Sequence, residues 1–208
     1  MRTRLLIIST AILIFSGMAK AQSIDAVWNE VKLPPSPELQ AVKIDSANTA
    51  LLILDIEERT CNLDRRPRCL ETVPKIAALM ARARAAKVPV IYSLTSKGTP
   101  DTILPQIKPT PDESIVQSSV DKFWHTDLEQ ILADKGITSV IVTGTAAHGA
   151  VLHTATAAGF RKLNVIVPVD CLSAKDTYIE QASVQLLLTG PGTRRVVKLT
   201  RSDLISFL

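Results

Sequence analysis

The chain has 208 residues, of which 46% are hydrophobic and 21% are charged, and its formal net charge at pH 7 is +4. This length is typical of one domain with a substantial core. Basic residues are not gathered into a stripe interleaved with aromatic residues, so the sequence gives no support to nucleic-acid binding.

The first predicted element is a signal peptide over residues 1–21. Arg2 and Arg4 form a basic start, an apolar run follows over residues 5–15, and small residues lead to Ala21, which is the order of a secretory signal. A membrane anchor is the alternative, but a bilayer span needs roughly 20 apolar residues. Cleavage after Ala21 removes three of the 24 basic residues and no acidic one, which leaves a net charge of about +1. The protein is therefore predicted to be periplasmic or secreted, with no membrane attachment after cleavage.

Residues 22–48 are predicted to form an extended N-terminal arm, since they contain Pro34, Pro35 and Pro37 and show little periodicity beyond one helical turn near 26–31. From residue 49 onward, short and uniformly apolar runs alternate with segments of helical periodicity. Such runs are typical of parallel strands buried on both faces, which predicts an open, doubly wound α/β sheet. The predicted strands are 50–54, 88–92, 115–120, 140–142, 165–167 and 196–199; the predicted helices are 71–87, 127–135, 150–158 and 173–188, with a loop over 94–114 and a last helical turn over 202–207.

Three cysteines remain after cleavage of the signal peptide. Cys61 and Cys69 flank a short polar loop, and they form either a local disulfide, which an oxidising compartment favours, or two unpaired thiols. Cys171 follows a predicted strand and is expected to be a small buried residue. The cysteines and histidines lack the spacing of a metal site, so neither a metal nor a cofactor is predicted.

Ligands bind such a sheet at the carboxyl ends of its strands, so the polar residues that follow the apolar runs are candidate site residues. Asp55 is either a capping or ion-pairing residue or an acid or base with a tuned pKa. Lys122 is either a solvated charge or, beside Asp55, a cation that holds an anionic intermediate. The turn over 143–150 leads into a helix, and its N–H groups form either an anion site or a place of close helix–sheet packing.

Together these segments resemble the isochorismatase-like superfamily of cysteine hydrolases, which includes nicotinamidases and other amidases. The resemblance runs from about Thr49 to Phe207 and rests on ALLILD ending in Asp55, on Lys122, and on GITSVIVTGTAAHGAVLHTATAAGF followed by NVIVPVD, in the family's order. It implies a hydrolase domain over 49–208 with a Rossmann-like sheet of about six parallel strands and helices on both faces. It also implies a cleft built around Asp, Lys and Cys, and a homo-oligomer.

The sequence departs from the family pattern at the nucleophile. Aligned on Gly144 and Val151, the position of the family's Cys is occupied by Ala150, whereas Asp55 and Lys122 match the other two catalytic residues. Hydrolysis of an amide through a thioester requires a thiolate, which alanine cannot provide. Loss of a comparable nucleophile costs about 10⁶ in turnover, or about 8 kcal/mol. Ordinary amidase chemistry is therefore disfavoured, and the metal pattern of nicotinamidases is also absent.

Two hypotheses of different classes follow. In the first, the protein hydrolyses a small molecule without a thiol, as the family's isochorismatases do with a vinyl ether: Asp55 is the general acid or base, Lys122 positions it or holds an anionic group, and the N–H groups of Gly149 and Ala150 bind a carboxylate or oxyanion. In the second, the protein is a non-catalytic descendant that binds a small acid or amide in the retained cleft. Cys171 is not an obvious substitute nucleophile.

Four further residues are candidates for the wall of the pocket, although each has an alternative role in packing. His148 faces the cleft or, as the favoured alternative, is a buried and hydrogen-bonded residue. The full set is Glu57, Trp124, His125 and His148.

Overall fold

The computed structural model describes residues 22–208, so the predicted signal peptide lies outside the described residues. The described chain divides after Ser36 into a short amino-terminal unit and the unit Pro37–Leu208. The first unit contains a 3-10 turn, η1 (Trp28–Glu30), inside the helical turn that the sequence predicts over 26–31. None of the helices within residues 22–208 is long and apolar enough to cross a membrane.

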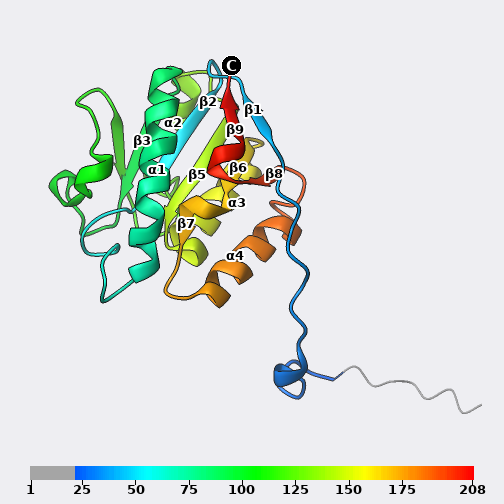
Figure 1. The fold of residues 1–208 in the computed structure, drawn as a ribbon. Helices are drawn as coiled ribbons and strands as arrows, with labels where there is room; N and C mark the ends of the chain where they lie inside the picture. The colour runs from blue at the N-terminus through cyan, green and yellow to red at the C-terminus, as the bar shows by residue number, and fades with distance from the viewer. Residues whose placement is uncertain (1–21) are drawn as a thin grey trace, which may run out of the picture. The chain divides into compact units, whose positions relative to one another are not determined.

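The second unit is built on a parallel sheet of seven strands in the order β4-β3-β2-β5-β6-β8, with β7 paired to β5 (Figure 1). All of its strand pairs are parallel, as uniformly apolar runs predict. The order reverses between β2 and β5, which makes that junction the topological switch point. The strands are β2 (Thr49–Leu54), β3 (Val90–Leu94), β4 (Ser114–Gln117), β5 (Ser139–Thr145), β6 (Asn164–Pro168), β7 (Leu172–Ser173) and β8 (Val197–Thr200).

Helices cover both faces of the sheet because alternate residues of each strand point to opposite sides. Leu51 and Ile53 of β2 pack with the helix α1 (Pro67–Ala85), which Figure 1 shows on the near side of the sheet. Leu52 and Leu54 belong to the apolar cluster of the other face. That face is covered by α2 (Leu128–Asp134), α3 (Leu152–Phe160) and α4 (Thr177–Thr189). The predicted doubly wound α/β fold is confirmed, with the two-residue strand β7 raising the number of strands from about six to seven.

At the two ends of the domain the structure differs from the predicted elements. β1 (Val42–Ile44), which lies within the predicted arm, pairs in parallel with β9 (Ile205–Phe207). The predicted last helical turn over 202–207 is therefore a 3-10 turn, Ser202–Leu204, followed by a strand. Strands of three residues carry too little periodicity to be recognised, and this pairing joins the two ends of the domain, which local patterns do not report.

Helix starts also differ from their predicted positions for local reasons. α1 begins at Pro67 because proline is well suited to the first position of a helix. α4 begins at Thr177, where the Asp176 side chain accepts a hydrogen bond from the Ile179 N–H and caps the helix. The residues just before this cap, which were predicted as helix, include Ser173 of β7.

Candidate active site

Asp55 follows β2 at the topological switch point of the sheet. Its φ of 54° is uncommon for a residue other than glycine and turns the chain sharply at the end of the strand. Its Oδ1 accepts a hydrogen bond from Ser93 Oγ at 2.7 Å and lies 2.8 Å from Lys122 Nζ. Only 6% of the Asp55 side chain is exposed. The structure thus brings the predicted Asp and Lys into one buried ion pair and adds Ser93, a residue at a strand end to which the sequence analysis assigned no specific role.

The Lys122 ammonium group is completely buried, and all of its protons have acceptors within the protein. Besides Asp55, Nζ donates to the carbonyl oxygens of Leu94 at 3.2 Å, Ser118 at 3.0 Å and Ser119 at 3.2 Å. An ammonium has three protons to donate, so these acceptors exhaust it. Of the two roles predicted for Lys122, this geometry fits the positioning of Asp55 and leaves no donor for an anionic substrate group.

Burial raises the pKa of the Asp55 carboxyl above its ordinary value. The charge and hydrogen bond of Lys122 and the hydrogen bond from Ser93 act in the opposite direction, and the negative charge of Glu57 adds to the increase. Desolvation therefore dominates over ion pairing at this carboxyl. A carboxyl with a raised pKa exchanges its proton closer to neutral pH than a surface aspartate does, which suits a general acid or base.

Ala150 lies in the turn η4 (Ala147–Val151) that joins β5 to α3. It is buried and precedes Thr154 by about one helical turn, so the two residues share a face. Thr154 Oγ1 accepts a hydrogen bond from the Lys122 backbone N–H at 3.1 Å. The position that the sequence analysis assigned to the lost nucleophile therefore lies on the helix face that contacts Lys122.

Gly144, near the end of β5, explains how closely β5 approaches β2. Its φ is +119°, and a β-carbon there would collide with the backbone of Leu54, so only glycine is accommodated. The predicted anion-binding N–H of Gly149 needs correction: it donates to Ala146 O at 2.9 Å and is not available to a ligand. This hydrogen bond is internal to the segment that joins β5 to α3, which the residue spacing did not reveal.

The predicted pocket residues separate into one buried and three exposed side chains. Glu57 is completely buried, and its Oε1 accepts a hydrogen bond from Thr95 Oγ1. Trp124 and His125 are exposed and contact each other edge to face, with ring centroids 4.4 Å apart. His148 is also exposed, which corrects the expectation of a buried, hydrogen-bonded histidine, because η4 turns its side chain toward the surface.

A disulfide joins Cys61 to Cys69 and ties the loop after β2 to the first turn of α1. The loop carries Arg66, which donates to Thr60 O at 3.3 Å. Burial lowers the pKa of Arg66, whereas the nearby negative charge of Asp55 raises it. The sequence analysis gave Arg66 no role, because the three arginines of this polar loop look equivalent in the sequence.

Cys171 lies in the apolar cluster on the α1 face of the sheet. Burial raises the pKa of its thiol to about 12, so it is an inert core residue and no substitute nucleophile. Among residues 22–208, His, Cys, Asp and Glu side chains do not gather in any group of three or more that could hold a metal ion.

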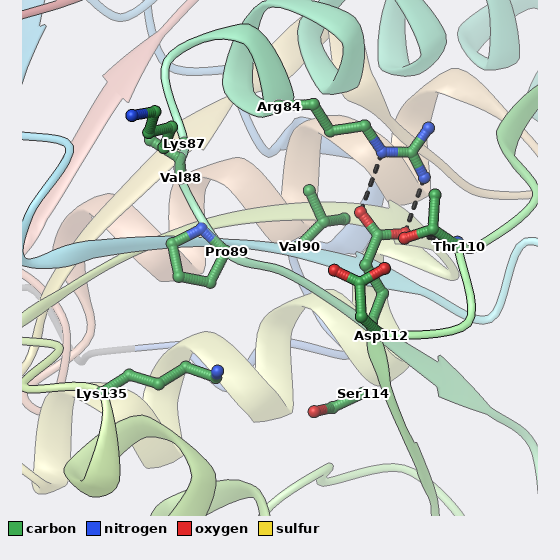
Figure 2. A pocket seen from close by; sticks show the side chains of 10 residues that line it. Arg84, Lys87, Val88, Pro89, Val90, Thr110, Asp112, Ser114 and Lys135 are labelled. Carbon is green, nitrogen blue, oxygen red and sulfur yellow. Dashed lines mark hydrogen bonds and ion pairs between the residues drawn. The ribbon is translucent and has the colours of Figure 1, made fainter.

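A surface pocket at the opposite ends of the strands is distinct from the Asp55 site (Figure 2). It lies beside Val90 and Ser114, the first residues of β3 and β4, whereas Ser93 is near the end of β3. Its Arg84 forms two hydrogen bonds to Glu113, at 2.8 and 2.6 Å. These two charges are paired with each other, so the pocket is a weaker candidate than the strand ends around Asp55.

The fold and the buried Asp–Lys pair at the switch point define a hydrolase-like α/β domain. The chain belongs to the isochorismatase family, whose domain model, described as the isochorismatase domain, matches residues 49–193. It is 25% identical to enterobactin synthase component B of Escherichia coli K12 over 169 residues, which is 68% of this chain and 59% of that relative. The chain thus spans less than two thirds of that relative's length.

Solved structures share the fold. A cysteine hydrolase from Pseudomonas syringae pv. phaseolicola superposes with a TM-score of 0.69 at 20% identity, covering 81% of this chain and 95% of that one. N-carbamoylsarcosine amidase from Thermoplasma acidophilum superposes with a TM-score of 0.66 at 22% identity, covering 75% and 97% of the two chains. At these identities the likeness establishes the architecture alone.

Proposed function

We propose that the mature protein is an exported hydrolase of the isochorismatase family that acts on a small molecule without a cysteine nucleophile. The observation that carries this proposal is the geometry of Asp55. Its Oδ1 is held by Ser93 and Lys122, whereas no donor among residues 22–208 reaches Oδ2. One oxygen of the carboxyl is thus fixed by the protein, and the other is left to exchange a proton with substrate or water.

The two protonation states of Asp55 define two reactions. When it is protonated, Oδ2–H donates the proton to the β-carbon of a vinyl ether, and water adds to the resulting oxocarbenium ion and returns a proton to Oδ2. The hemiketal formed in this way then collapses to a carbonyl compound and an alcohol. When it is charged, Oδ2 accepts a proton from the water molecule that attacks a carbonyl carbon. In both cases Lys122 keeps the carboxyl in place and favours its charged form. Ala150, aligned with the family's nucleophile, supplies no thiolate for a thioester.

The disulfide supports the proposed export. Bonds such as Cys61–Cys69 persist in oxidising compartments and are rare in reducing ones. Together with the secretory pattern of residues 1–21 this favours a periplasmic or secreted protein. Cell fractionation, with mass spectrometry of the mature amino terminus, tests the proposal: a chain that begins at Gln22 in the exported fraction supports it, and an uncleaved cytoplasmic chain contradicts it. That the protein forms a homo-oligomer remains a prediction, and light scattering, which measures its molar mass in solution, tests it.

A ligand-binding protein without activity is the second candidate, and the buried Asp55–Lys122 pair is compatible with it. The acceptors of Lys122 Nζ all belong to the protein itself, which fits a structural role for the pair. Buried pairs of this kind can persist as structural elements, since removal of one member leaves the other charge unpaired.

One experiment separates the two candidates. The mature protein, residues 22–208, is assayed beside Asp55→Asn on a panel of small amides, esters and vinyl ethers. Asp101→Asn, a change at an exposed aspartate, is the matched control. Turnover that Asp55→Asn abolishes and Asp101→Asn retains supports the hydrolase. Absence of turnover supports the ligand-binding candidate, and equal turnover in all three proteins contradicts catalysis centred on Asp55.

A further inference from the structure

Glu57 is a buried carboxyl beside Asp55 that the proposed reaction does not use. Two hydrogen bonds run side by side at the ends of β2 and β3: Ser93 Oγ donates to Asp55 Oδ1 at 2.7 Å, and Thr95 Oγ1 donates to Glu57 Oε1 at 2.5 Å. Ser93 and Thr95 are spaced by two at the end of β3, which places their side chains on the same side of that strand and their two acceptors next to each other. Glu57 thus extends the row of polar groups that begins at Asp55.

The second carboxylate oxygen of Glu57 has no partner within the described part of the chain. Oε2 is buried and accepts no hydrogen bond from residues 22–208, and Glu57 forms no ion pair with them. Asp55, by contrast, is balanced by Lys122 at 2.8 Å. A buried carboxylate oxygen without a donor is costly and rare in native proteins. The observation points to a donor that a bound ligand supplies.

The turn over residues 95–98 lies against this oxygen. A β-carbon at Gly98 would collide with Glu57 Oε2, so the Gly98 backbone rests directly on that oxygen. The Gly98 N–H donates to Thr95 O and closes the turn at 3.0 Å. Gln117 Nε2, from β4, donates to the carbonyl oxygens of Thr95 at 2.9 Å and Gly98 at 2.7 Å. One side chain therefore fastens the turn, while its outer residues, Ser96 and Lys97, are exposed.

We propose that Glu57 is a specificity residue whose Oε2 accepts a hydrogen bond from an N–H group of the substrate when the turn over 95–98 moves aside. The substrate class is then a small molecule with an amide, amine or amidine group next to the bond that is hydrolysed. A carboxylate accepts charge-assisted hydrogen bonds from such groups and repels another carboxylate. This inference rests on the proposed function, which places the substrate beside Asp55, and it adds that the substrate carries a hydrogen-bond donor for Glu57.

The test is a binding measurement that needs no turnover. Acetamidinium and acetate have the same planar shape and opposite charge, and each is titrated into residues 22–208 by NMR. The wild-type protein is expected to bind acetamidinium more tightly than acetate. Glu57→Gln is expected to weaken acetamidinium binding by about 10-fold or more, the usual range for a hydrogen bond to a charged group. Glu58→Gln, the same change at an exposed neighbour, is expected to leave both affinities unchanged.

Three results overturn the inference: no binding of acetamidinium by the wild-type protein, an unchanged preference in Glu57→Gln, or an equal loss in Glu58→Gln. If Glu57→Gln does not fold, Gly98→Ala takes its place, because its β-carbon displaces Oε2 and must alter the acetamidinium affinity. The two proposals fail separately. Turnover that is unchanged in Asp55→Asn contradicts the proposed catalytic role of Asp55 but not the preference for acetamidinium. Loss of that preference in the wild-type protein, with turnover that depends on Asp55, contradicts only the proposed role of Glu57.

Discussion

Lys122 Nζ lies 2.8 Å from Asp55 Oδ1, and neither side chain is more than 6% exposed. Charges taken out of water in this way depend on each other, because removal of one leaves the other unpaired in the protein interior. Lys122→Met is therefore expected to lower the free energy of unfolding by about 3–5 kcal/mol. Urea unfolding followed by circular dichroism measures it, with Lys97→Met at an exposed position as control. A loss in Lys122→Met no greater than that of the control contradicts the role assigned to the pair.

The raised pKa of Asp55 predicts how stability depends on pH. A carboxyl whose pKa is higher in the folded than in the unfolded state stabilises the fold in its protonated form. That contribution is complete below the ordinary value of 3.8 and is lost as pH rises through the folded pKa. In Asp55→Asn this dependence is absent. The difference in unfolding free energy between the wild type and Asp55→Asn should therefore shift against the wild type as pH rises above the ordinary value of 3.8. A shift in the opposite direction would show that Lys122 outweighs burial.

The Cys61–Cys69 disulfide closes a loop with a sequence separation of 8. The chain-entropy relation assigns about 2–3 kcal/mol to such a loop. The double variant Cys61→Ser/Cys69→Ser should lose that amount of unfolding free energy, measured in urea against the oxidised wild type. A reductant should lower the stability of the wild type toward that of the variant and should leave the variant unchanged. Equal stability of all the samples would contradict a structural role for the bond.

Ala150→Cys tests whether residue 150 occupies the place of a nucleophile. Its thiol would stand on the helix face that contacts Lys122, whereas the native Cys171 has a pKa raised to about 12 by burial. The variant is expected to release a burst of p-nitrophenol from p-nitrophenyl acetate, as an acylated thiol does. The wild type, which retains Cys171, is the control. If the variant shows no burst and its thiol resists iodoacetamide while the protein stays folded, residue 150 does not face the site.

Much of the fold could be predicted from the sequence because its strands are short apolar runs, and segments with helical periodicity separate these runs. The pairing of β1 with β9 could not be predicted from the sequence. Strands of three residues are too short to show a periodic pattern, and no local feature specifies a partner so distant in the chain. For the same reason the Ser202–Leu204 segment was predicted as part of a helical turn, although a strand follows it.

The sequence predicted the two charged residues of the candidate site, but it did not predict the hydrogen bonds and side-chain directions around them. Asp55 and Lys122 meet because the carboxyl ends of parallel strands share one edge of the sheet. The engagement of the Gly149 N–H and the outward direction of His148 follow from the winding of η4, which small residues alone do not specify. Arg66 could not be distinguished from Arg65 in the sequence, whereas in the folded loop Arg66 is half-buried and Arg65 is exposed.

The turnover ratio of the mature protein to Asp55→Asn tests the central claim most directly. A substrate from the panel of amides, esters and vinyl ethers is first identified with the wild type, and kcat is then compared at equal protein concentration. Loss of a general acid or base costs typically 10²–10⁴ in rate, so the account predicts a decrease of at least about 100-fold in Asp55→Asn. An unchanged kcat in a folded Asp55→Asn protein would contradict it.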